Sequence, residues 1–129
     1  MTNSYTSIAD QYHYEYLTWK RILEFFKREN SFLKTRLSEV LDNKTGKDFL
    51  ALAEHFQNEF IVKDEFINDL YTDVEQLEKL LQEISITNKN NLGTKIETRH
   101  NKLRNEMEYL EKSFIQLKNE FNRYVVSIL

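Results

Sequence analysis

The pattern that decides the fold is clearest in residues 96–128, which read IETRHNKLRNEMEYLEKSFIQLKNEFNRYVVSI. Apolar side chains recur there in alternating steps of four and three residues, from Ile96 to Ile128. Such steps average about 3.5 residues, which is the repeat of a coiled coil. The stretch therefore predicts one long helix with a single apolar seam along its side.

Two earlier stretches carry the same spacing, and we call each run of such positions a ladder. The three ladders predict helices over about residues 7–41, 46–86 and 94–128, with residues 1–6 frayed. The ladder positions are Tyr12, Tyr16, Trp19, Leu23, Phe26, Asn30, Leu33, Leu37, Val40; Phe49, Ala53, Phe56, Phe60, Lys63, Ile67, Leu70, Val74, Leu77, Leu81, Ile84; and Ile96, His100, Leu103, Met107, Leu110, Phe114, Leu117, Phe121, Tyr124, Ile128.

The two breaks between the ladders carry helix-start signals. Thr45 followed by Asp48 is a weak capping box, and Thr94 followed by Glu97 is a full one. Both breaks are short, so neighbouring helices must reverse direction. The chain of 129 residues is thus predicted to be a single all-α domain, an elongated antiparallel up-down-up three-helix coiled-coil bundle. With Trp19 in the core of its first helix, it is similar in shape to a spectrin-type repeat, and Trp19 and the heptads alone carry this likeness.

Charges beside the ladders predict which residues of neighbouring helices meet. Matching the helices level by level from the two turns gives three attractive pairs, each worth about 0–1 kcal/mol. The predicted pairs are Lys27 with Asp64, Glu15 with Arg104, and Glu29 with Lys118.

Composition excludes several classes of function. The chain has no cysteine, which excludes disulfides, thiolate metal sites and cysteine nucleophiles. The net charge of −3, without a basic face, argues against nucleic-acid binding. No apolar run approaches the length of a membrane span, and no leader sequence is evident, so we expect a soluble, cytoplasmic protein.

Asn30 and Lys63 are polar residues at ladder positions of adjacent helices, within roughly one turn of each other in the predicted hairpin. A polar core layer can fix the register of a bundle at some cost in stability. Two alternatives remain open. The pair can form a buried site that recognises a ligand or partner, or Lys63 can lie at a solvent-facing edge.

His100 is the third polar ladder residue. Glu97 precedes it by three residues, the spacing that carboxylate-bridged metal sites use in helical bundles, and His13 is predicted nearby. The alternative is a hydrogen-bonded, partly buried histidine near a helix end. No catalytic constellation or cofactor motif is present in the sequence, so we expect no enzyme, cofactor or small-molecule substrate.

Phe25 and Phe32 lie one heptad apart on a face that a three-helix core leaves exposed, and Ile61 and Tyr109 point outward similarly. These four residues are the predicted partner-binding residues. The alternative is that a shifted register buries the phenylalanines within the monomer.

Three functional hypotheses follow. The first is a non-enzymatic interaction or scaffold protein that uses its helix faces to bind a protein partner or a second copy, as in a homodimer. The second is a small acidic helical chaperone or export cofactor. The third is a metal- or ligand-binding bundle that uses His100, His13 and Glu97.

Overall fold

The computed structural model describes residues 4–43, 47–86 and 93–128, all of which are helical. Helix α1 spans Ser4–Asn43, α2 spans Lys47–Ile86 and α3 spans Gly93–Ile128. The predicted all-α three-helix bundle is confirmed, and α1 begins a few residues earlier than predicted. Residues 1–3 of the predicted frayed end, Thr45, and the side chains of Asp48 and Thr94 lie outside the described residues.

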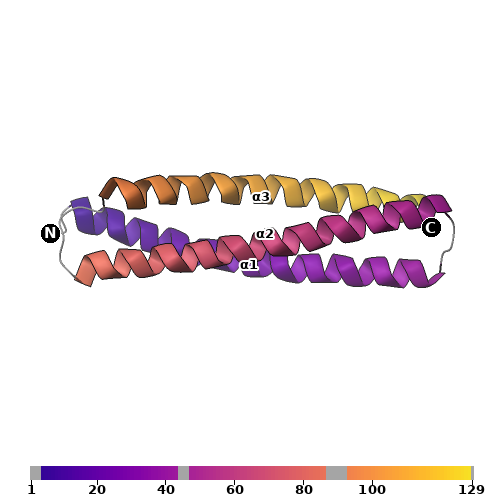
Figure 1. The fold of residues 1–129 in the computed structure, drawn as a ribbon, viewed down its shortest axis with the longest axis horizontal. Coiled ribbons are helices and arrows are strands. Elements are labelled where there is room, and N and C mark those ends of the chain that lie inside the picture. Colours follow the sequence, from indigo (N-terminus) through magenta and orange to yellow (C-terminus); the bar gives the residue numbers. More distant parts are fainter. Residues whose placement is uncertain (1–3, 44–46, 87–92, 129) are drawn as a thin grey trace.

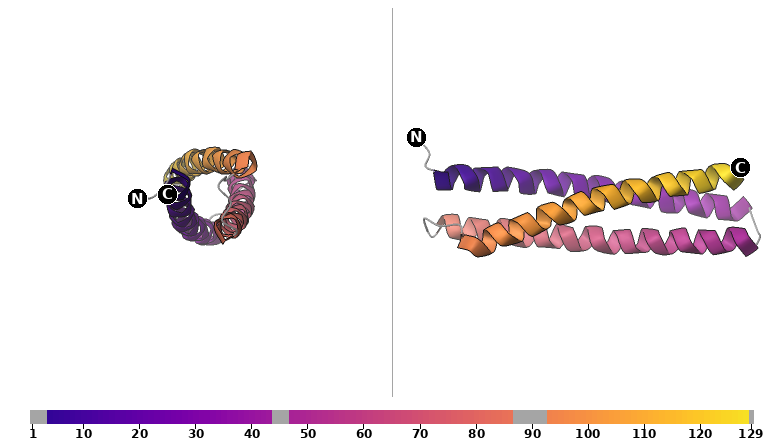
Figure 2. Two further views of the ribbon diagram at one scale, coloured as in Figure 1. Left: turned by 90° about the vertical axis from the view of Figure 1, so that its left-hand side faces the viewer. Right: turned by 90° about the horizontal axis from the view of Figure 1, so that it is seen from above.

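The three helices lie side by side along nearly their whole length, so the molecule is elongated (Figure 1). They also twist around one another, which is clearest in the second pair of views (Figure 2). The ammonium of Lys20, in the first half of α1, lies 2.8 Å from a carboxylate oxygen of Glu78 near the end of α2. None of the described helices is long and apolar enough to cross a membrane.

Absence of proline lets each helix run without a break, because proline removes a backbone donor and clashes with the preceding turn. Gly93 begins α3 with a φ of 76°, a conformation that glycine adopts without steric cost. Many other surface positions are Glu, Lys, Gln and Arg, which are good helix formers. The two breaks between the ladders therefore decide where α1 ends, where α2 begins and ends, and where α3 begins.

The core consists of the ladder positions. Apart from Tyr12, Phe49, Ile84 and Ile128, which are partly buried, every ladder residue is buried. Val125 is the one further buried apolar side chain among those that the structure describes. A fully buried Leu or Phe stabilises the fold by roughly 1.5–3 kcal/mol, so the ladders supply most of the driving force.

One predicted pairing between α1 and α2 is wrong. Lys27 donates a hydrogen bond to Asn68 at 3.3 Å, and Asp64 pairs with Lys34 in place of Lys27. Side chains lean toward the N-terminus of their own helix, so in an antiparallel pair they lean in opposite directions. The residues of α1 and α2 whose side chains touch are therefore offset by about one helical turn from the residues whose backbones lie at the same level. The prediction had paired residues by backbone level.

Asn30 is fully buried and held by α2. Its amide nitrogen donates to the carbonyl oxygen of Phe60 at 2.8 Å and to Oδ1 of Asp64 at 2.7 Å. Its own Oδ1 is buried without a hydrogen-bond partner. An orphaned acceptor of this kind costs about 1–3 kcal/mol, and we expect Asn30 to set how α1 and α2 meet at this expense of stability.

Lys63, the other predicted member of the polar layer, is also buried, with 8% of its surface exposed. Its ammonium is not among the buried side-chain atoms that lack a hydrogen-bond partner in the described part of the chain. The contact that Asn30 makes across the helix pair is thus with Asp64, one residue further along α2.

Replacing Asn30 by leucine tests this role. Asn30→Leu removes the orphaned acceptor and keeps the same branched arrangement of four side-chain heavy atoms, so we expect the free energy of unfolding to rise by about 1 kcal/mol. Urea denaturation followed by circular dichroism measures the change. The exposed control Asn122→Leu should stay within about 0.5 kcal/mol of the natural protein. A clear loss of stability in Asn30→Leu would contradict the assignment.

Candidate interaction groove

The seam between α1 and α3 is the most open of the three, because these two helices approach each other less closely than either approaches α2. Two ion pairs bridge it. A terminal nitrogen of Arg104 lies 2.8 Å from Oε1 of Glu15, and the ammonium of Lys118 lies 2.9 Å from Oε1 of Glu29. Both pairs were predicted from the sequence and are confirmed.

The heptad between these two bridges lacks an ion pair. Ile22 occupies the position that Glu15 and Glu29 occupy in their heptads, and Glu111 occupies that of Arg104 and Lys118. An isoleucine cannot hold an acidic side chain across the seam. The bridges are therefore separated by two heptads, about 21 Å of helix, with an apolar gap between them.

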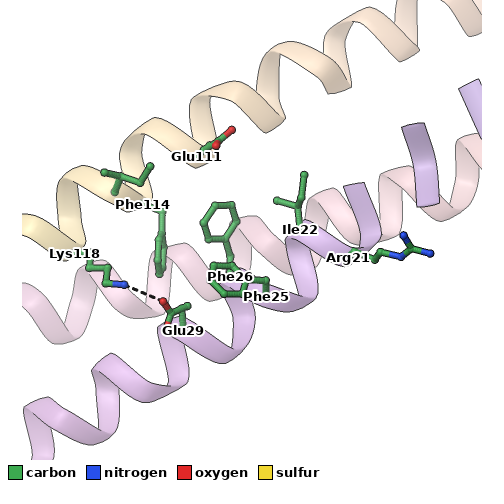
Figure 3. A pocket seen from close by; sticks show the side chains of 9 residues that line it. Arg21, Ile22, Phe25, Phe26, Glu29, Glu111, Phe114 and Lys118 are labelled. Carbon is green, nitrogen blue, oxygen red and sulfur yellow. Dashed lines mark hydrogen bonds and ion pairs between the residues drawn. The ribbon is translucent and has the colours of Figure 1, made fainter. Parts of the chain in front are cut away.

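This gap is a groove with a volume of about 430 Å³. In it, Phe26 of α1 and Phe114 of α3 point toward each other, with ring centres 4.9 Å apart (Figure 3). The Glu29–Lys118 contact crosses the groove beside them (Figure 3). We call this feature the α1–α3 groove, and it is lined by Arg21, Ile22, Phe25, Phe26, Glu29, Glu111, Phe114, Ile115 and Lys118.

The chemistry of the α1–α3 groove suits an apolar side chain flanked by charges. Phe25 and Ile115, each about half exposed, belong to opposite helices. Arg21 on α1 and Glu111 on α3 also line it, and neither forms an ion pair within the described part of the chain. Apolar walls between unpaired charges are features of surfaces that pack against another helix.

The four predicted partner-binding residues are all exposed, but they do not gather in one place. Phe25 lines the groove, and Phe32 lies one heptad further along α1, with 64% of its surface exposed. Ile61 on α2 lies outside the groove. Tyr109 does too, because its ring packs 6.0 Å from that of Phe66 of α2.

Sequence reasoning did not place Ile22 and Ile115 in a site. The sequence does contain a signal. The pair Glu15 and Arg104 is repeated two heptads later by Glu29 and Lys118, but the heptad between them has Ile22 and Glu111 at these positions. The charges along α1 and α3, taken together, therefore locate the groove, whereas the exposed apolar residues alone do not.

His100 is fully buried, not partly buried as expected, in a cluster of α1 aromatic residues at the other end of this seam. Its ring stacks on that of Tyr12 at 3.6 Å, and the ring of Trp19 lies 5.0 Å away. Nδ1 lies 3.0 Å from the hydroxyl oxygen of Tyr16, and Nε2 lies 3.2 Å from Oε1 of Glu15. Nη2 of Arg104 also lies 3.1 Å from Nε2, so this ring nitrogen faces both a carboxylate and a guanidinium.

Burial keeps this histidine neutral. It lowers the pKa of His100 below the ordinary 6.5 by more than Glu15 raises it, and Arg104 lowers it further. Partial burial alone would raise the pKa of Glu15, but hydrogen bonds from Arg104 and His100 outweigh this effect and hold it below 4.5. The cluster therefore joins a neutral ring to an ionised carboxylate at neutral pH.

The metal hypothesis gains no support from this geometry. His13 lies 3.9 Å from Glu78 of α2, while His100 is engaged by Glu15 and Tyr16. Within residues 4–43, 47–86 and 93–128, no three histidine, aspartate or glutamate side chains converge as metal ligands.

Comparisons with protein families, with curated proteins and with solved structures found no match to this chain. Its function must therefore be argued from the groove and the surfaces beside it.

The buried His100 predicts how stability depends on pH. Because its pKa is lower in the folded than in the unfolded chain, its contribution is complete above about pH 6.5 and is lost as the pH falls. We expect the urea midpoint to fall between pH 7.5 and 5.5, and to fall less in His100→Gln. Glu15 adds its own loss only below about pH 4.5.

The control is His55→Gln, which replaces an exposed histidine of α2. It should keep the pH dependence of the natural protein. If the urea midpoint of His100→Gln depended on pH as in the natural protein, protonation of this ring would not contribute to the pH dependence of stability.

Proposed function

We propose that this protein is a non-enzymatic helical interaction protein that binds a protein partner through the α1–α3 groove. The observation that supports this most is the missing bridge between the Glu15–Arg104 and Glu29–Lys118 pairs. It leaves an apolar groove where the neighbouring heptads are closed by charge.

Exposed apolar residues next to the groove support the same proposal. Phe25 and Phe32 expose 51% and 64% of their surface on one stripe of α1, and Ile115 of α3 faces the groove from the other side. Burying such large side chains against a partner is favourable, at roughly 25 cal/mol per Å² of apolar surface. A helix laid into the groove would cover them together.

Site-specific photocross-linking tests the proposal. A photoreactive phenylalanine analogue is placed at position 25, 32, 61 or 109 of the full chain in living cells, and cross-linked products are detected by their mass. We expect protein adducts from positions 25 and 32, because both adjoin the groove, and few from positions 61 and 109.

Position 109 is a matched control for position 32, since Tyr109 and Phe32 are equally exposed at 64% but lie on different seams. The absence of adducts at both positions 25 and 32 would refute the proposed function. Adducts to many unrelated unfolded chains would instead favour a chaperone.

A further inference from the structure

We infer that the occupant of the α1–α3 groove is α1 of a second copy of this chain, packed antiparallel about a two-fold axis. This inference rests on the proposed function and names its partner. It comes from the arrangement of charges and phenylalanines along the exposed face of α1, which complements both itself and the groove.

The groove sets two requirements for an occupant. It must supply an apolar side chain to fill the space between Phe25 and Ile115. It must also supply a cation near Glu111 and an anion near Arg21, because these two groups have no ion-pair partner within the described residues.

The exposed face of α1 meets the first requirement. Phe32 is a large apolar side chain with 64% of its surface exposed, and it projects from the same helix that forms one wall of the groove. Arg28 precedes it by four residues and Arg36 follows it by four, so all three lie on neighbouring turns of one face. The segment thus carries an apolar group between two cations.

A two-fold axis between Arg28 and Glu29 satisfies the symmetry of such an assembly. In an antiparallel pair, contacts step forward on one helix as they step backward on the other. If Phe25 contacts the partner's Phe32, then Arg28 meets the partner's Glu29, and the partner's Arg28 meets Glu29. Each copy uses the same stripe, which is the mark of an isologous interface.

The second requirement is met by the same register. It places the partner's Arg36 directly opposite Arg21, since these two residues are equally far from the axis, and across the groove from Glu111. Within one chain, Arg36 lies 3.8 Å from Glu39, so the partner's Glu39 arrives with it. Two acids and two bases then gather at this end of the groove, so Glu111 and the partner's Glu39 offset the charges of Arg21 and the partner's Arg36.

The two-fold axis therefore fills both grooves at once. Phe32 of each copy enters the groove of the other beside Phe25, and the ion pair between Glu29 and Lys118 bounds the contact. A helix from an unrelated protein would need the same order of one apolar side chain between charges, which α1 already carries.

The test is the molar mass of the full chain, measured by sedimentation equilibrium over a range of concentrations. We expect a reversible dimer, and we expect Phe32→Ser to raise its dissociation constant at least about tenfold, as removal of a central aromatic anchor does. Tyr109→Ser removes an equally exposed aromatic from the other seam and should leave the constant unchanged. Circular dichroism establishes that each variant keeps its helices.

Charge reversal tests the register independently. Glu111→Arg should weaken the dimer, since it leaves the partner's Arg36 surrounded by cations, and adding Arg36→Glu to it should recover most of the lost affinity. If a single variant lost affinity only because its fold was destabilised, its urea midpoint would be lowered. The second substitution would not restore that midpoint.

Three results would overturn the inference: a monomer at every concentration, equal weakening by Tyr109→Ser, or no recovery in the double variant. A monomer whose position 25 still cross-links to a different protein would overturn the second copy as occupant and leave the proposed function standing. A monomer without any adduct at positions 25 and 32 would remove both.

Discussion

The burial of side chains spaced alternately four and three residues apart is the constraint on which the rest of the structure depends. Each of the three helices has one such ladder, and a bundle is the arrangement that removes all three from water together. This constraint fixes the rotation of each helix about its own axis. It thereby decides which residues flank the seams and which are left on the surface.

The flanking residues then determine how tightly each seam is closed. Lys20 with Glu78 and Lys34 with Asp64 bridge α1 to α2, and Glu15 with Arg104 and Glu29 with Lys118 bridge α1 to α3. None of these exposed or half-exposed pairs contributes much stability by itself. These ion pairs matter here because the seam between α1 and α3 is open in the heptad that lacks one. Ile22 opposite Glu111 leaves an apolar opening between the two charged heptads.

The sequence predicted the helices and the buried residues well because both follow from a local repeat. It also predicted the Glu15–Arg104 and Glu29–Lys118 pairs, since side chains of two parallel helices lean the same way and level matching holds. It failed for Lys27 and Asp64 because antiparallel side chains lean in opposite directions. Register across an antiparallel seam needs this geometric offset, which no local pattern contains.

The polar core residues show a similar limit. Their burial was predicted from position, but their partners were not. Asn30 is bonded to Asp64 and to a backbone carbonyl, and His100 is enclosed by Tyr12, Tyr16 and Trp19 from a helix distant in sequence. A buried polar group selects its partner from what three-dimensional packing brings within reach, so its identity can be read only from the folded chain.

Installing the missing ion pair tests whether the unbridged heptad creates the binding surface. In the double variant Ile22→Glu/Glu111→Lys, the open heptad carries the same residue types as the Glu29–Lys118 heptad that follows it. We expect the variant to keep its helical circular dichroism and to sediment as a monomer at concentrations where we expect the natural chain to dimerise. A variant that associates as strongly as the natural chain would contradict the claim that the unbridged heptad creates the binding surface.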